Sequence, residues 1–241
     1  MANTDWFTSW FNTSYYHILY KDRNDADAQL FMQNITEFLK LPTEAHILDL
    51  PCGKGRHSVY LNSLGYRVTG GDLSENSIAH AKQFENDRLR FVVKDMRQKF
   101  NYSYDVVLNL FTSFGYFEHD EEEIRVLQNI KNGFNPNGTL VLDFLNVDYV
   151  KAHLVKKEVK TIDGIAFHIQ REIKDGFILK HISFTDQGVD HSYTEQVKYL
   201  DLAKFEEYFT AAGLTITQTF GDYQLSEFDV KTSERLILVA K

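Results

Sequence analysis

Cysteine, proline and long apolar runs are all scarce in this sequence of 241 residues. There are one cysteine and three prolines, and no apolar run approaches the roughly 18 residues that a membrane-spanning helix needs. A lone cysteine cannot form an internal disulfide. With no signal peptide in view, it predicts a cytoplasmic protein that has no membrane partner. Cys52 is either a reactive thiol beside a helix N-terminus or a small residue packed inside a turn.

Positive charge is also in short supply. Lys and Arg number 26 against 34 Asp and Glu, which gives a net charge of −8. Binding to a phosphate backbone needs a basic footprint, so nucleic acid is not an expected partner. Hydrophobic residues at 43% and charged residues at 25% are ordinary for a globular protein of one main domain. What is abundant is aromatic residues, which are unevenly placed.

The stretch ILDLPCGKGRHS, residues 47–58, organises the chain. An apolar run ends in Asp49, Gly53 and Gly55 follow, and a helix can then begin. Glycines let a backbone approach a ligand closely, and a helix N-terminus offers unpaired N–H groups. The pattern, with Ser58 in third place, nearly fits the dinucleotide fingerprint, so a nicotinamide-dependent oxidoreductase is one hypothesis. Asp49, an acid at the end of the strand before the glycines, argues against the oxidoreductase hypothesis.

Two more acids follow later apolar runs. Asp72 lies just past a strand expected at 66–69 and 17 residues beyond Gly55, near the distance at which an acid meets ribose hydroxyls. A helix cap is the alternative role for Asp72, although Ser74 can cap that helix itself. Asp95 ends the run LRFVVKDM, residues 89–96. Alternating strands and helices with an acid after each of three strands predict a doubly wound α/β domain.

The stretch around Asp49 resembles the first motif of class I S-adenosylmethionine-dependent methyltransferases, [DE]-x-G-x-G-x-G. Pro51 stands where that motif has its first glycine, and it has no N–H to offer a cofactor. The resemblance covers about residues 45–145 well and the last two strands loosely. It implies a Rossmann-like sheet of seven strands whose last strand is antiparallel, and S-adenosylmethionine as the cofactor. The cofactor contacts that it implies are Asp49, Gly53, Gly55, Asp72, Leu73, Asp95, Met96, Asn109, Phe111 and Tyr16.

Residues 6–20, WFTSWFNTSYYHILY, concentrate aromatic side chains at a helical spacing. We expect one or two short helices that either bury aromatics on the core or form a lid over the cofactor. Tyr16 and Tyr20 match a Y-x-x-x-Y spacing in the N-terminal segment of some small-molecule methyltransferases.

A second aromatic segment, FTSFGYF at 111–117, follows the strand expected at 104–110. Its place after a central strand puts it at the edge of the sheet where ligands bind. The residues that we predict to contact the substrate are Phe114, Tyr116 and Phe117 from this segment, with Tyr20, Asn146 and Arg171. Core packing is an equally good interpretation for each aromatic of this segment.

Three parts of the chain are predicted. Residues 1–40 form a helical arm or lid, residues 41–146 and 200–241 form the cofactor-binding domain, and residues 147–199 form an antiparallel β insertion. The insertion is predicted from alternating segments separated by turns such as Asp175-Gly176. We interpret it as a cover for the active site or as the contact of a homodimer.

The implied reaction is methyl transfer to a small-molecule acceptor, since no N-P-P-[YF] motif follows the fourth strand. His57, His119 and Glu195 are candidates for a base, and no catalytic residue is assigned. The acidic run at 120–123 is interpreted as a helix start, without a metal. A non-catalytic S-adenosylmethionine-binding protein is the second hypothesis, and the oxidoreductase is the third.

Overall fold

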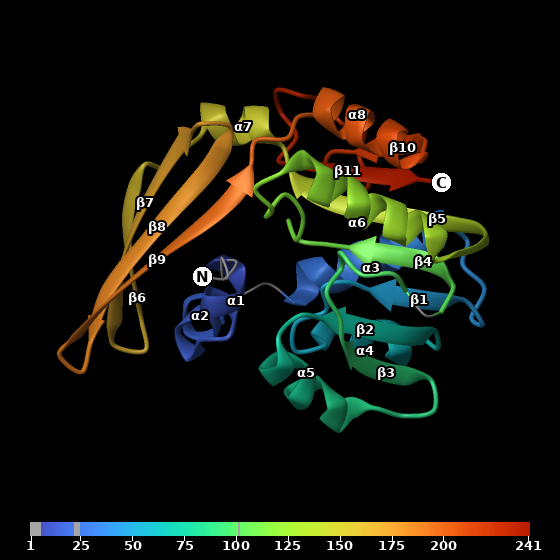
Figure 1. The fold of residues 1–241 in the computed structure, drawn as a ribbon, viewed down its shortest axis with the longest axis horizontal. Helices are drawn as coiled ribbons and strands as arrows, with labels where there is room; N and C mark the ends of the chain where they lie inside the picture. The colour runs from blue at the N-terminus through green and yellow to red at the C-terminus, as the bar shows by residue number, and fades with distance from the viewer. Residues whose placement is uncertain (1–5, 22–24, 101) are drawn as a thin grey trace.

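The computed structural model describes residues 6–21, 25–100 and 102–241. Within them the chain forms two separate β-sheets, one of seven strands and one of four. Figure 1 shows the seven-stranded sheet with its helices on one side of the molecule and the four-stranded sheet on the other. The N-terminal helices lie between the two.

The larger sheet has the strand order β10-β11-β5-β4-β1-β2-β3. Strands β1 to β5 pair in parallel, and β11 runs antiparallel to both of its neighbours. The strands are β1 (His46–Asp49), β2 (Arg67–Asp72), β3 (Leu89–Val93), β4 (Tyr104–Asn109), β5 (Phe134–Leu145), β10 (Ile216–Phe220) and β11 (Arg235–Ala240). The predicted mixed sheet of seven strands, with its last strand antiparallel, is confirmed.

Helices cover both faces of this sheet. They are α3 (Asp25–Phe38), α4 (Arg56–Ser63), α5 (Glu75–Ala81) with the 3-10 turn η1 (Lys82–Phe84), α6 (Asp120–Asn132) and α8 (Leu202–Ala212). Buried residues of α3, α4 and α5 share one core cluster, and those of α6 and α8 share the other. Caps fix the ends of α8, because the Asp201 side chain accepts from the N–H of Lys204 and Gly213 turns out of the helix at φ 76°.

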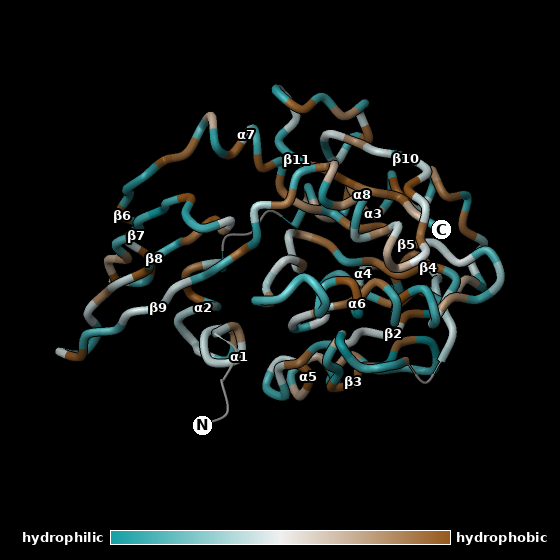
Figure 2. Tube along the Cα trace, turned by 45° about the horizontal axis from the view of Figure 1, so that its top comes forward, coloured by the Kyte–Doolittle hydropathy of each residue, from teal (hydrophilic) through white to brown (hydrophobic). Residues whose placement is uncertain are grey.

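The central strands are apolar on both faces because both faces are covered. In β4, Val106 and Leu108 join the core cluster of α3 to α5, while Val107 between them joins the cluster of α6 and α8. β11 repeats this alternation with Leu236, Ile237 and Leu238. Figure 2 shows apolar residues along these strands. This double burial is why the sequence shows continuous apolar runs here rather than alternation.

The second sheet has the order β6-β7-β8-β9 and is antiparallel throughout. Its strands are β6 (Lys157–Ile162), β7 (Ile165–Lys174), β8 (Phe177–Asp186) and β9 (Val189–Lys198). Two-residue turns join them, each with positive φ at both positions, as at Asp175 and Gly176 (φ 50° and 79°). Such turns suit the twist of a hairpin. The predicted antiparallel insertion is confirmed from residue 157 onwards.

Two local expectations need correction. Residues 147–152, expected in the β insertion, form the short helix α7 (Val147–Ala152), because the Asn146 side chain caps its first turn. Residues 135–138, NPNG, are typical of a turn before a strand, yet they lie within β5, where the pairing with β4 jumps from Tyr104↔Phe134 to Val106↔Thr139. The extra residues are accommodated as an irregularity in the strand rather than as a turn before it.

The N-terminal aromatics form α1 (Trp6–Phe11) and α2 (Ser14–Leu19), as the spacing predicted. Trp10 and Leu19 are buried against the inner face of the four-stranded sheet, in a cluster with Phe167, Ile182 and Phe184. Helix α3, by contrast, packs with the main sheet. We call residues 6–21 the N-terminal arm.

Candidate active site

A cavity of about 430 Å³ lies at the carboxyl ends of the parallel strands. Five segments supply most of its wall: the N-terminal arm, the glycine loop after β1, the end of β2, the end of β3, and the aromatic loop after β4. The lining residues include Phe7, Phe11, Tyr16, His17, Tyr20, Lys21, Pro51, Cys52, Gly53, His57, Asp72, Leu73, Ser74, Ser77, Lys94, Asp95, Met96, Leu110, Phe111, Ser113, Tyr116 and Phe117. Ligands of open α/β sheets bind at this edge.

The two glycines of the loop have different roles. Gly53 lines the cavity with φ 54°, and a Cβ added there would meet no atom within 4 Å. Gly55 has φ 84° and faces the core, where a Cβ would come within 2.6 Å of the Phe91 ring. Gly53 therefore keeps the cavity wall open, whereas Gly55 allows close packing beneath the loop.

Asp72, the last residue of β2, presents its carboxylate at the cavity. One oxygen accepts the N–H of Gly53 and the other accepts the N–H of Ser74, both at 2.8 Å. Ser74 caps helix α5 with its own hydroxyl, so Asp72 is not needed as the cap. Burial raises the pKa of Asp72, and the two N–H donors oppose that shift. The two hydrogen bonds orient the carboxylate, and its oxygens can still accept further hydrogen bonds from a ligand.

Asp49 lies behind the glycine loop rather than in the cavity wall. Its carboxyl is buried, and it accepts a hydrogen bond from the Ser58 hydroxyl at 2.6 Å. Burial raises its pKa to about 7, with the Ser58 hydrogen bond opposing the shift. The pair ties the end of β1 to the first turn of α4, so Asp49 shapes the loop from underneath.

Asp95 and Met96 reach the cavity from the loop after β3. The Arg97 guanidinium lies 2.8 Å from the Asp95 carboxylate and also pairs with Glu122 at 3.0 Å. Burial raises the pKa of Asp95, but the contacts with Arg97 outweigh it and hold the pKa below its usual range. Asp95 is therefore a fixed, ionised acceptor at the cavity.

The aromatic loop is held from behind by Asp143 of β5. Its buried carboxylate accepts the N–H of Phe111 at 2.8 Å and pairs with Arg235 at 2.8 Å. Phe111 itself adopts φ 59° and lines the cavity. Asn109, in contrast, is fully buried and is outside the lining, because its amide donates to the carbonyl oxygen of Leu50 at 2.9 Å. It joins the two loops instead of facing the cavity.

The aromatics of this loop divide between cavity and core. Tyr116 and Phe117 line the cavity, and the Tyr116 hydroxyl donates to the carbonyl of Thr112 at 2.6 Å. Phe114 is 1% exposed and packs against Phe205 at 5.9 Å between ring centroids. The structure thus does not bring Phe114 to the cavity, although it was predicted to contact the substrate.

Asn146 and Arg171 also lie away from the cavity. The Asn146 amide donates to the backbone carbonyls of Val230 and Ser233 at 2.9 and 2.8 Å. Arg171, on β7, pairs with Glu158 of the neighbouring strand. Both side chains are used to join segments of the fold, which the spacing of polar residues along the sequence does not reveal.

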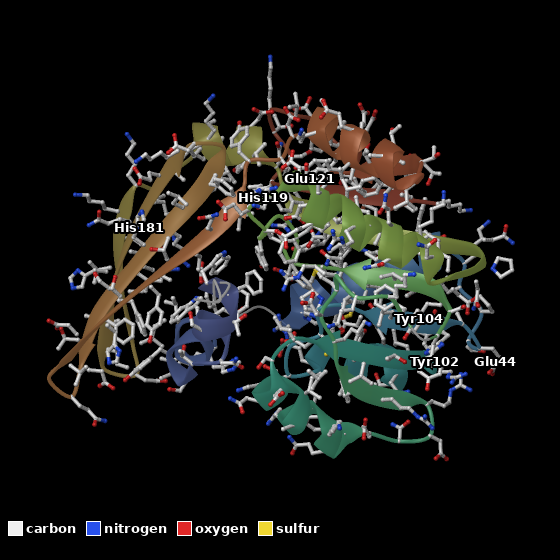
Figure 3. All side chains as sticks on the ribbon, viewed as in Figure 1. Glu44, Tyr102, Tyr104, His119, Glu121 and His181 are labelled. Carbon is white, nitrogen blue, oxygen red and sulfur yellow. The ribbon has the colours of Figure 1, made fainter. Side chains whose placement is uncertain are left out.

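The candidate bases are dispersed. His57 lines the cavity, with its ring 4.6 Å from that of Phe111. His119 is exposed at the start of α6 (Figure 3), and Glu195 is on β9, outside the lining.

Burial raises the pKa of Cys52 strongly, which agrees with a packed residue and not with a reactive thiol.

Comparisons with known proteins agree with this geometry. Residues 47–138 match the methyltransferase domain family. The putative methyltransferase YqeM of Bacillus subtilis (strain 168) is 33% identical over 107 residues, which cover 43% of this chain and 43% of that protein. The dTDP-3-amino-3,4,6-trideoxy-alpha-D-glucopyranose N,N-dimethyltransferase of Streptomyces venezuelae is 26% identical over 188 residues, 73% of this chain and 78% of that enzyme.

A solved S-adenosylmethionine-dependent methyltransferase from Clostridium acetobutylicum ATCC 824 superposes with a TM-score of 0.78 at 18% identity, covering 94% of this chain and 95% of that one. The fold is thereby matched over almost the whole length. Residues 47–138 thus match a methyltransferase domain, and almost the whole chain has the fold of an S-adenosylmethionine-dependent methyltransferase.

The cavity fits S-adenosylmethionine. Its volume lies in the range of small-molecule sites, roughly 300–1,000 Å³. A ribose diol and an amino group both need hydrogen-bond acceptors, and the cavity offers the carboxylates of Asp72 and Asp95, with apolar surface from Leu73 and Met96 beside them. Gly53 leaves the wall free where a side chain would intrude.

Several residues of the cavity wall were not predicted from the sequence. Lys94 precedes Asp95, and Ser77 lies in the first turns of α5. His17 and Lys21 belong to the arm, where the aromatic pattern drew attention to other side chains. Leu110 and Ser113 flank Phe111. For Leu110 and Ser113, the only indication in the sequence was their place at the end of a predicted strand.

Within residues 6–21, 25–100 and 102–241, no three His, Cys, Asp or Glu side chains gather as a group that could hold a metal ion. Over the same ranges, no helix has both the length and the apolar character to cross a membrane.

Proposed function

We propose that the protein transfers the methyl group of S-adenosylmethionine to an amine nitrogen of a small, polar acceptor. The observation that carries this proposal is a single cavity that combines the oriented acids Asp72 and Asp95 with an aromatic wall from two separate segments. Such a cavity suits a cofactor with a polar adenosine end and a second, smaller molecule beside it.

Each side of the cavity has its own task. Asp72 would accept hydrogen bonds from the ribose hydroxyls, and Asp95 with Met96 would hold the adenine. Gly53 would let the cofactor approach the backbone closely. When bound, the cofactor supplies a methyl group on a positively charged sulfur. The rings of Phe111, Tyr116 and the arm aromatics favour a cation nearby, by roughly 0.5–2 kcal/mol per contact. What the protein adds to the chemistry is alignment of the acceptor, which small displacements can spoil.

An amine acceptor is favoured by the relative from Streptomyces venezuelae, whose name states N,N-dimethylation of an amino sugar. A protonated amine has no lone pair to attack with, so it must lose its proton first. His57 and His17 line the cavity and are the groups placed to receive that proton. His119 and Glu195 lie outside the cavity lining, so neither is placed to receive that proton.

The test is incubation with S-adenosylmethionine carrying a labelled methyl group and a panel of small amines, including amino sugars and amino acids. The expected result is label in an N-methylated product, and none in O-methylated or S-methylated controls. Tight binding of S-adenosylhomocysteine without transfer to any member of the panel or of a whole metabolite extract would favour a non-catalytic binding protein. His57→Gln should lower the turnover of the identified amine most strongly at low pH.

A further inference from the structure

Tyr20 connects the cavity with the four-stranded sheet. Its side chain lines the cavity, but its hydroxyl donates to the Glu195 carboxylate, with both oxygens at 2.7 Å. Lys180 donates to the same hydroxyl and lies over the Tyr20 ring, 4.5 Å from its centroid. Lys180 and Glu195 stand on neighbouring strands, where they are direct partners across β8 and β9.

The carboxylate of Glu195 also holds a second arm residue. The indole N–H of Trp10 donates to it at 2.7 Å, and the Trp10 ring lies 4.4 Å from that of Tyr193 on the same strand. Lys180 completes the group with an ammonium 3.4 Å from Glu195. The side chains of Lys180 and Glu195 are only 16% and 15% exposed, so this charge pair is well shielded. One carboxylate thus accepts from helix α1 and from Tyr20, the residue that ends helix α2.

The arm is attached to the main domain as well. The Trp6 indole donates to the carbonyl of Tyr116 at 3.4 Å, and the Trp6 and Phe7 rings contact the Tyr116 ring. The arm therefore lies between the insertion sheet and the aromatic loop (Figure 1). A shift of the arm would move Tyr20 and Tyr16 at the cavity wall together.

We propose that Glu195 and Lys180 are positioning residues for the active site: from the insertion sheet they fix Tyr20, and through it the arm, as a wall of the cofactor cavity. The role of the insertion is then to set ligand affinity from a distance, without touching the ligand. This inference rests on the function proposed above for the cavity itself.

A ligand-independent readout is available because the chain has two tryptophans, Trp6 and Trp10, and both lie in the arm. Glu195→Gln removes the negative charge that pairs with Lys180 and that accepts hydrogen bonds from Trp10 and Tyr20. Tryptophan emission of the unliganded variant should shift to the red, and acrylamide quenching should increase. Glu172→Gln is the matched control, since Glu172 is an exposed glutamate of the same sheet that pairs with His181 at 3.4 Å.

Affinity for S-adenosylhomocysteine, measured by calorimetry, tests the link to the cavity. Glu195→Gln should weaken binding about tenfold, the scale of a lost hydrogen bond to a charged group. Tyr20→Phe should weaken it similarly, and Glu195→Gln should add less in the Tyr20→Phe background than it does alone, because the Tyr20 hydrogen bond is then already lost and only the Trp10 contact remains to be weakened. A general loss of stability would instead add to the effect of Tyr20→Phe.

Three results would overturn the inference: unchanged fluorescence in Glu195→Gln, a fluorescence change with unaltered affinity, or full additivity of the two changes. Failure of the wild-type protein to bind S-adenosylhomocysteine would contradict the proposed function instead. The fluorescence comparison would still report whether Glu195 holds the arm, so the two failures are distinguishable.

Discussion

The backbone N–H of Gly53 donates to the carboxylate of Asp72 at 2.8 Å. This contact joins the glycine loop after β1 to the end of β2, the two places where the cofactor would meet the sheet. The same carboxylate is held from its other side by the N–H of Ser74. One acid thus sets the shape of the loop and remains oriented at the cavity, so the loop and the ribose site proposed at Asp72 are held together.

Replacing Asp72 should therefore have a large effect on cofactor affinity. Asp72→Asn keeps the size of the side chain but turns an acceptor into a donor that faces one of the two N–H groups. We expect S-adenosylhomocysteine to bind more weakly by about 1–3 kcal/mol, the cost of leaving buried polar partners unmet. Titration calorimetry measures this, with the exposed Asp87→Asn as control. Equal affinities in the two folded variants would refute the role of Asp72.

The effect of alanine at Gly53 can be compared with its effect at Gly176, which serves as a matched control. Both have positive φ, 54° and 79°, and at neither would a Cβ meet an atom within 4 Å. Alanine should thus strain both positions alike, by roughly 1–3 kcal/mol. Only at Gly53 does the added methyl group face the cavity, so only Gly53→Ala should weaken cofactor binding. Thermal unfolding reports the strain and calorimetry the affinity; a parallel loss of affinity in Gly176→Ala would contradict the assignment.

The stability of the protein should fall as pH rises from about 4.5 to about 7. Burial raises the pKa of Glu123 from 4.5 to about 7, while its hydrogen bonds from the N–H groups of Phe117 and Gly115 oppose the shift. Between these values the unfolded chain has released the proton that the folded state keeps, so unfolding becomes easier with pH. The slope is about 1.4 kcal/mol per pH unit for one such group.

Urea unfolding at several pH values measures this dependence. Glu123→Gln should reduce the slope, and buried Asp49, whose pKa is also raised to about 7, should account for a further part of the same sign. Glu121→Gln, at an exposed position of the same helix (Figure 3), should leave the slope unchanged. Stability that is flat from pH 4.5 to 7 in the wild-type protein would show that these two carboxyls titrate normally.

The fold followed from local patterns in the sequence. Apolar runs, the glycine loop and the acids at 49, 72 and 95 each depend on residues close together in the chain. They predicted the order of strands and helices, and the resemblance that they carry supplied the sheet. The irregularity at 135–138 escaped because it depends on a tertiary contact, the pairing of β5 with β4. The cap of helix α7 is local, since Asn146 accepts from the N–H of Asp148, so this signal was present in the sequence and was missed.

The site was predicted less completely, for a physical reason. A strand alternates its faces, and the sequence does not say which polar residue at the strand end turns toward the ligand. Asp72 lines the cavity, whereas Asp49 binds Ser58 beneath the loop and Asn109 binds the Leu50 carbonyl. The Tyr20–Glu195 hydrogen bond spans 175 positions of sequence. No local spacing indicates it.

The central claim is that the cavity around Gly53 and Asp72 binds S-adenosylmethionine. The most direct measurement is thermal unfolding of the wild-type protein with saturating S-adenosylmethionine, S-adenosylhomocysteine, NADH or NADPH, because a ligand that binds only the native state raises the melting temperature. At a ligand concentration 100 times Kd, the stabilisation is about 2.7 kcal/mol. The account predicts a clear increase with the first two ligands and none with the nicotinamides. An increase with NADH or NADPH alone would contradict it.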